Sequence, residues 1–313
     1  MTPSDPRETQ VDDSTVATPH LRTLPQVAEL PEFQGGWRRS DGSWAPYLSF
    51  VDDDHSVNWS DELEELHEES SRDHFIDVWT RRSMLERIGP LPRRPLIVDL
   101  GCSTGYLLED LQVRYPDALL AGVDLVAAGL RKAHVNVPEA RLLQADVGAL
   151  PLADASVDAA LSANLLEHVP DDNGALRELR RVLKPGARGV LVVPAAPSTY
   201  DYYDRFLGHE RRYAKRELAG KARDAELEVL EDIHLGSVLF PAFWLVKQRN
   251  RRRFASLAGA ELEQRVAANI AGTSDSAFGR GACALERALL SRGVRLPFGI
   301  RSLTVVRRPE ERS

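Results

Sequence analysis

The stretch "LIVDLGCSTGYLLEDL", residues 96–111, gives the clearest indication of the fold of this chain. Its first five residues are mostly apolar, as in a buried strand, and residues 105–115 carry apolar side chains at helical spacing. A strand that runs through a glycine-containing turn into a helix presents backbone N–H groups and the positive helix end to a ligand. The stretch therefore predicts a ligand-binding strand–turn–helix unit of an α/β protein.

The residues of this turn argue against a dinucleotide as the ligand. The G-x-G-x-x-G fingerprint needs three glycines, but the chain has Gly101, Ser103 and Tyr106 at those places. Just before the turn, the carboxylate of Asp99 would repel a pyrophosphate and attract an ammonium group. Asp124 and Asp146 end the next two predicted strands, where they can accept hydrogen bonds from a ribose and from an adenine amino group. The pattern predicts a nucleoside that bears an amino acid.

Strands and helices are predicted to alternate after residue 90. The alternation indicates a doubly wound parallel sheet with helices on both faces. The predicted strands are residues 96–100, 119–124, 141–146, 157–163 and 189–194, with helices at 105–115, 125–135 and 173–186. Residues 227–235 and 302–308 add two strands, and a long insertion separates them.

The remaining segments extend this core. Residues 1–54 are rich in Pro, Asp, Ser and Thr, and we expect a flexible tail followed by an arm that docks. Residues 55–90 are predicted to form a lid helix that starts near Ser60 and stops at Gly89 and Pro90. The expected organisation is completed by a core at 91–236, a cap or insertion for the acceptor at 237–300, and the last strand with a C-terminal tail at 301–313.

Composition narrows the possible partners and the compartment. A formal net charge of −7 argues against binding nucleic acid through bulk charge. The two cysteines, Cys102 and Cys283, suggest neither a disulfide framework nor a zinc site. Without a secretory signal or a membrane-spanning apolar run, we expect a soluble, cytoplasmic protein.

The turn and the acid-ended strands resemble those of the class I S-adenosylmethionine-dependent methyltransferases. Residues 99–105 are similar to their first motif, with Ser103 in place of the middle glycine, and residues 162–169 and 176–194 are similar to later family segments. The resemblance covers roughly residues 60–308. It implies a seven-stranded, Rossmann-like sheet and S-adenosylmethionine as cofactor. The implied cofactor-binding residues are Asp99, Gly101, Cys102, Ser103, Gly105, Asp124, Leu125, Asp146, Val147 and Asn164.

Candidate catalytic residues follow the fourth and fifth predicted strands of the core. Asn164, Glu167 and His168 are spaced to share one helix face, and His209 lies in a "GHxRRY" segment, residues 208–213. The pattern resembles methyltransferases with that segment and the metal-dependent small-RNA 2′-O-methyltransferases, although Asn164 stands where the latter have a glutamate. Two mechanisms stay open. In one, a divalent metal is held loosely by Glu167, His168 and His209. In the other, which we favour, His209 acts as a general base while His168 orients it or packs.

The acceptor is predicted by resemblance alone. The arm at residues 45–82 resembles methyltransferases that modify the oligosaccharide of mycofactocin, which implies O-methylation of a sugar hydroxyl on a small-molecule or glycan-bearing acceptor. Methylation of a quinone, phenol, lipid-linked acceptor or amine stays open, as does a non-catalytic binding protein. Residues 238–253 join an apolar segment to a basic cluster, which suits a peripheral membrane contact or a packed cap helix. Acceptor-lining candidates are His67, His74, Trp79, Tyr200, Tyr202 and Tyr203; the oligomeric state is not indicated.

Overall fold

A computed structural model describes residues 32–38, 42–51, 72–254, 261 and 277–310 of the protein. Its centre is an eight-stranded sheet with the strand order β3-β6-β5-β4-β7-β8-β10-β9. The strands from β3 to β8 pair in parallel, and β10 pairs antiparallel with both β8 and β9. The strands are β3 (Leu48–Ser49), β4 (Leu96–Leu100), β5 (Leu119–Asp124), β6 (Arg141–Gln144), β7 (Val157–Ala163), β8 (Leu183–Pro194), β9 (Glu228–Leu235) and β10 (Arg301–Arg307).

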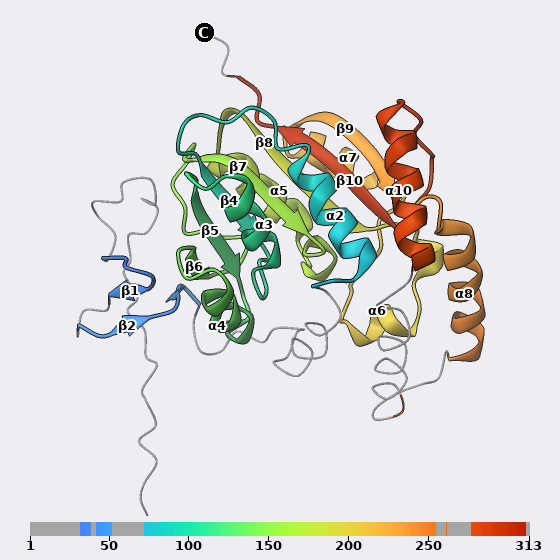
Figure 1. The fold of residues 1–313 in the computed structure, drawn as a ribbon, viewed down its shortest axis with the longest axis horizontal. Coiled ribbons are helices and arrows are strands. Elements are labelled where there is room, and N and C mark those ends of the chain that lie inside the picture. Colours follow the sequence, from blue (N-terminus) through green and yellow to red (C-terminus); the bar gives the residue numbers. More distant parts are fainter. Residues whose placement is uncertain (1–31, 39–41, 52–71, 255–260, 262–276, 311–313) are drawn as a thin grey trace, which may run out of the picture.

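Helices cover both faces of this sheet (Figure 1). The helices α2 (Phe75–Leu85), α3 (Tyr106–Arg114), α4 (Ala127–Asn136) and α10 (Ala277–Ser291) pack on one face, and α5 (Asp172–Val182) and α7 (Glu217–Asp224) pack on the other. Short α6 (Tyr202–Phe206) and longer α8 (Phe240–Arg253) lie at one side of the sheet, beyond the end of β8 (Figure 1). The doubly wound architecture predicted from the alternation is confirmed.

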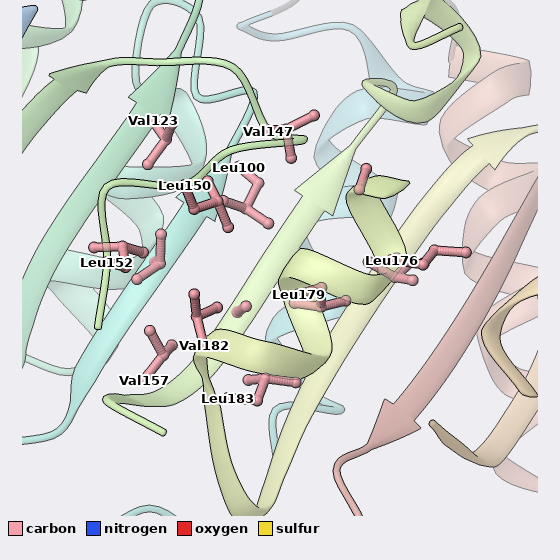
Figure 2. Packing of buried hydrophobic residues seen from close by; sticks show 14 of the residues in the cluster. Leu100, Val123, Val147, Leu150, Leu152, Val157, Leu176, Leu179, Val182 and Leu183 are labelled. Atoms are coloured by element: carbon pink, nitrogen blue, oxygen red, sulfur yellow. The ribbon is translucent and has the colours of Figure 1, made fainter. Parts of the chain in front are cut away.

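The core explains why β4 sits in the middle of the sheet. All five of its residues are buried, as expected of a parallel strand covered on both faces. Figure 2 shows the packing on one of these faces, where Leu176, Leu179 and Val182 of α5 share a hydrophobic cluster with Leu100 of β4 and Val157 of β7. The side chain of Asp171 caps α5 by accepting a hydrogen bond from the Gly174 amide at 2.9 Å.

The N-terminal arm adds a strand that the sequence did not predict. Leu48 and Ser49 form β3, which pairs in parallel with β6, so the sheet has eight strands rather than seven. Two short strands, β1 (Trp37–Arg38) and β2 (Trp44–Ala45), form a separate antiparallel pair. Trp37 is fully buried, and its indole N–H donates to the Leu142 carbonyl at 3.1 Å. These contacts fasten the arm to the edge of the sheet.

The predicted lid helix lies only partly within the described residues. The lid helix appears as α2, which begins at Phe75; its expected start near Ser60 lies outside the described residues. Cys102 and Cys283 are both buried free thiols. Among the residues that the structure describes, none of the helices combines the length and the apolarity that crossing a bilayer requires.

Candidate active site

A cavity of about 1140 Å³ opens at the carboxyl ends of the central strands. One wall consists of the turn after β4, the ends of β5 and β6, and the loop after β7. The other wall comes from α2, the region around α6, and the insertion helices α8 and α10. Single-ligand pockets usually have about 300–1,000 Å³, so this volume suits a cofactor together with an acceptor.

The turn after β4 has the backbone geometry of a ligand cradle. Gly101 has a φ of +74°, and a Cβ there would lie 2.9 Å from the side chain of Leu165. Ser103, at the place of the usual middle glycine, also has a positive φ of 43°. Gly105 has a φ of +85° and precedes α3, but it packs against Ala133 and does not line the cavity. Gly105 therefore shapes the turn, whereas Gly101, Cys102 and Ser103 border the ligand space.

Asp99 and Asp124 give this wall its negative charge. Asp99 is only 2% exposed. Burial, followed by repulsion from Asp124, raises the pKa of Asp99 to about 8. Asp124 accepts hydrogen bonds from the backbone amides of Ser103 at 2.8 Å and Val126 at 2.9 Å, so it also holds the turn in shape. A cation beside Asp99 would relieve the cost of its buried charge.

The remaining predicted cofactor residues line the same wall. Asp146 accepts a hydrogen bond from the Gly148 amide at 2.7 Å, and Leu125 and Val147 lie beside it along the cavity. Asn164 also lines the cavity, but the expectation that it shares a helix face with Glu167 and His168 is wrong. Its φ is +54°, and the 3-10 helix η1 starts only at Leu166 and ends at His168. The backbone turns before the helix begins.

Glu167, His168 and His209 meet in the cavity although 41 positions separate His168 from His209 in sequence. One ligand atom from each of the three lies within 4.8 Å of the others. Glu167 is fully buried, and among the described residues neither of its carboxylate oxygens has a hydrogen-bond partner. Burial raises the pKa of Glu167 to about 7, against the opposing charge of His209. The three candidate catalytic residues thus form one cluster.

The orientation of His209 is fixed by Asp204, a residue that sequence reasoning missed. Nδ1 of His209 lies 2.9 Å from Oδ1 of Asp204, and the Nε–H of Arg212 donates to that same oxygen at 2.6 Å. Burial alone would raise the pKa of Asp204, but the hydrogen bond from His209 and the charges of Arg212 and Lys247 hold it well below its usual range. The ionised Asp204 accepts a hydrogen bond from the Nδ1–H of His209, which leaves Nε2 as the acceptor nitrogen.

The backbone also ties the His209 loop to η1. The amide of Glu210 donates to the Glu167 carbonyl at 2.8 Å, and the hydroxyl of Tyr213 donates to the Leu166 carbonyl at 3.1 Å. Tyr213 falls in the segment 208–213 that the sequence singled out for His209, and Asp204 lies five residues before His209. An acidic residue a few positions before a candidate histidine is the sequence signal that could have identified Asp204.

The cationic side chains that line the cavity are paired within the protein. Every arginine and lysine that lines the described cavity forms an ion pair with a carboxylate. Aromatic rings from Phe75, Tyr203 and Phe243 lie on the same side. The ion pairs are Arg81 with Asp110, Arg212 with Asp204, Lys247 with Asp201, and Arg301 with Asp77.

The helix α8 shows which part of residues 238–253 faces the site. Lys247 is its only buried residue, and its ammonium group donates to Asp201 at 2.7 Å. Phe243 and Val246 also line the cavity, while Trp244 and Leu245 are exposed. The peripheral membrane contact expected for this segment stays a prediction. Of the acceptor-lining candidates, His74 and Tyr203 border the cavity, Trp79, Tyr200 and Tyr202 do not, and His67 lies outside the described residues.

Part of the chain is similar in sequence to known methyltransferases. Residues 98–191 match the protein family described as "Methyltransferase domain". The chain is 39% identical over 129 residues to trans-aconitate 2-methyltransferase of Azoarcus sp. (strain BH72), which covers 41% of this chain and 49% of that protein. It is 38% identical over 118 residues to demethylmenaquinone methyltransferase of Thermus thermophilus, and the match covers 36% of this chain and 53% of that protein. The chain thus spans about half the length of these curated relatives.

Solved structures share the fold at low sequence identity. A putative methyltransferase in complex with the Haloferax volcanii Trm112 activator has a TM-score of 0.54 at 20% identity, covering 81% of this chain and 96% of that one. Phosphoethanolamine N-methyltransferase 2 of Haemonchus contortus, in complex with S-adenosyl-L-methionine, has a TM-score of 0.55 at 14% identity, covering 80% and 58%. Residues 98–191 therefore match a methyltransferase domain, as the resemblance of the first turn implies, and the described chain shares its fold with solved methyltransferases.

Proposed function

We propose that this chain transfers the methyl group of S-adenosylmethionine to a hydroxyl oxygen of an uncharged, polyhydroxylated acceptor. The acceptor class is a sugar on a glycosylated small molecule or peptide-derived cofactor, of which a mycofactocin-type oligosaccharide is the specific candidate. Two observations support the proposal. Residues 98–191 match a methyltransferase domain, and the cationic side chains on the acceptor side of the cavity are paired with carboxylates.

The residues present fit S-adenosylmethionine. Burial and the charge of Asp124 destabilise the ionised form of Asp99 and raise its pKa. The ammonium group of the methionine part would stabilise that ionised form. Asp124 ends β5 where a ribose would lie, and a carboxylate offers about four acceptor sites, enough for the turn and for hydroxyl groups. Asp146, Leu125 and Val147 border the space for the adenine.

One observation carries the choice of an uncharged acceptor. A site for a carboxylate or phosphate acceptor normally offers a cationic group to it, because a buried anion is costly without a partner. Here the cationic side chains of the described cavity are already neutralised by carboxylates of this chain. Hydrogen-bonding groups beside aromatic rings instead suit a neutral acceptor with several hydroxyls.

The positions of these residues indicate what the cofactor and the chain each contribute to methyl transfer. When bound, S-adenosylmethionine supplies a methyl group that is already activated on a sulfonium sulfur. The cavity walls hold an acceptor hydroxyl in line with that methyl group, and positioning of this kind provides much of the rate. The groups placed to promote loss of the hydroxyl proton are Glu167, His168 and His209.

A second candidate function is methylation of a phenol or quinone. The aromatic rings of Phe75, Tyr203 and Phe243 along the cavity favour it, since a phenol is also uncharged. By contrast, no contact in the described site favours a purely non-catalytic use of the cofactor pocket.

The test is transfer of a labelled methyl group from S-adenosylmethionine to a panel of acceptors. We expect incorporation into neutral oligosaccharide glycosides and little into trans-aconitate, a catechol or a primary amine. A parallel comparison of metabolites from a deletion strain and its parent should show glycosylated compounds whose masses differ by one methylene. Transfer to the catechol, the amine or the tricarboxylate without transfer to any glycoside would contradict the proposed acceptor.

A further inference from the structure

We propose that Glu167, His168 and His209 form a binding site for one divalent transition-metal ion. The three residues come from two segments, since Glu167 and His168 lie in η1 and His209 follows α6. Their ligand atoms lie within 4.8 Å of one another, and the rings of the two histidines have centroids 4.8 Å apart with an interplanar angle of 83°. All three residues line the cavity.

The strongest support comes from the carboxylate of Glu167. This side chain is 0% exposed, and neither oxygen receives a hydrogen bond from the described part of the chain. A buried carboxylate without a partner is strongly destabilising, and natural proteins compensate such groups with a charge or a metal. A cation between Glu167 and the two imidazoles would satisfy it directly.

The orientation of His209 is also that of a metal ligand. Histidines that bind metals usually donate their second ring N–H to a carboxylate, which fixes the tautomer and increases the basicity of the ligating nitrogen. Asp204 has this relation to His209, with 2.9 Å between the carboxylate oxygen and Nδ1. Asp204 is itself held by Arg212 at 2.6 Å, so it is a positioning residue for His209.

The donor set determines which ions fit. Two imidazole nitrogens and one carboxylate favour zinc or cobalt over magnesium and calcium, which prefer oxygen ligands alone. Bonds of about 2.0–2.2 Å place ligand atoms of one ion roughly 3–3.6 Å apart, so the widest separation here would close by about 1 Å. Three protein ligands leave coordination positions open toward the cavity, as in catalytic zinc sites.

The role of the ion in catalysis rests on the proposed function. An acceptor hydroxyl at an open position would lose its proton to solvent more readily. Its oxygen then forms a bond to the methyl carbon while the carbon–sulfur bond breaks, giving a methyl ether and S-adenosylhomocysteine. Between the two mechanisms that the sequence leaves open, the geometry therefore points to the one with a metal.

The experiment is a titration of the chelator-treated, full-length protein with Co²⁺, followed by visible absorption and calorimetry. We expect one Co²⁺ per chain, displaced by Zn²⁺ but not by an equal concentration of Mg²⁺. Affinity should fall at least tenfold in Glu167→Gln and in His209→Asn, and about 10–100-fold in Asp204→Asn. His134→Gln removes a histidine of α4 outside the cluster and should leave the affinity unchanged.

Two outcomes would overturn the site: wild-type protein that binds neither Co²⁺ nor Zn²⁺ at millimolar concentration, or Glu167→Gln protein that binds them as tightly as wild type. If Glu167→Gln fails to fold, His168→Asn provides the same test at a partly exposed position. Calorimetry with S-adenosylmethionine on the same samples separates the two proposals. Cofactor binding without metal binding refutes only the metal site, and metal binding without cofactor binding refutes the proposed function.

Discussion

Asp99 lies at the end of the central strand, where it has almost no contact with solvent and stands close to a second carboxylate. These two conditions, burial first and the charge of Asp124 second, raise its pKa to about 8. At neutral pH much of Asp99 is therefore protonated before a ligand arrives. A cationic ligand favours the ionised form, so its binding should release a proton from this residue.

The first prediction is that affinity for S-adenosylmethionine rises with pH below about pH 8. A group whose pKa falls on binding makes the association constant rise by up to about tenfold per pH unit below its free-state pKa, by linkage. Calorimetry from pH 6 to pH 8 measures this slope. Asp99→Asn is the control, because it cannot titrate, and its profile should be flatter. Equal slopes for the two proteins would show that Asp99 does not face the cation.

The second prediction concerns His209, which either donates to a metal or accepts the hydroxyl proton. In both cases His209→Ala should lower turnover by roughly 10²–10⁴, the usual contribution of such a group, with affinity for S-adenosylmethionine nearly intact. The measurement is a single-turnover methyl-transfer assay beside calorimetry, with His134→Ala as a matched control. Wild-type turnover in His209→Ala would leave positioning as the only role of this part of the site.

At the scale of the elements, α2 forms one wall of the cavity through His74, Phe75 and Asp77. Asp77 is ion-paired with Arg301 at the start of β10, and the same guanidinium donates to the Thr80 hydroxyl at 2.7 Å. A helix from the N-terminal region is thus bound to the last strand of the sheet. Its loss would remove both a wall of the site and a partly buried ion pair.

The third prediction follows from this arrangement. Removing residues 1–30 should leave affinity for S-adenosylmethionine unchanged, because that segment is too polar in composition to contribute a core. Removing residues 1–79 takes away half of α2 and should abolish cofactor binding or cooperative unfolding. Thermal unfolding and calorimetry on the two truncated proteins check this. A stable 80–313 fragment with full affinity would refute the role of α2 as a lid.

The sequence predicts the regular elements well and the irregular ones poorly. Apolar runs such as residues 96–100 and 157–163 gave the bounds of β4 and β7, because buried parallel strands need continuous apolar sequence. β3 has two residues, too few for any periodicity, and its pairing with β6 comes from tertiary contacts. The left-handed backbone of Asn164 likewise depends on the loop around it, so residue spacing alone placed this side chain wrongly on a helix.

In the whole molecule, the site joins residues that range from His74 to Arg301. The cofactor wall comes from consecutive strand ends, which is why spacing and chemistry could predict Asp99, Asp124 and Asp146. The acceptor wall comes from α2, α8 and α10, which are distant in sequence and meet only in the folded protein. Sequence therefore predicted which residues line this wall of the cavity, whereas ion pairs such as Lys247 with Asp201 required the structure.

The residues of the turn after β4 suit S-adenosylmethionine rather than a dinucleotide. Calorimetry of the full-length protein with S-adenosylmethionine, S-adenosylhomocysteine and NAD tests it most directly. We predict binding of the first two and no binding of NAD. Asp124→Ala should weaken S-adenosylmethionine by about 1–3 kcal/mol, since a charged hydrogen-bond acceptor is lost. Binding of NAD without binding of S-adenosylmethionine, or undiminished affinity in Asp124→Ala, would contradict the account.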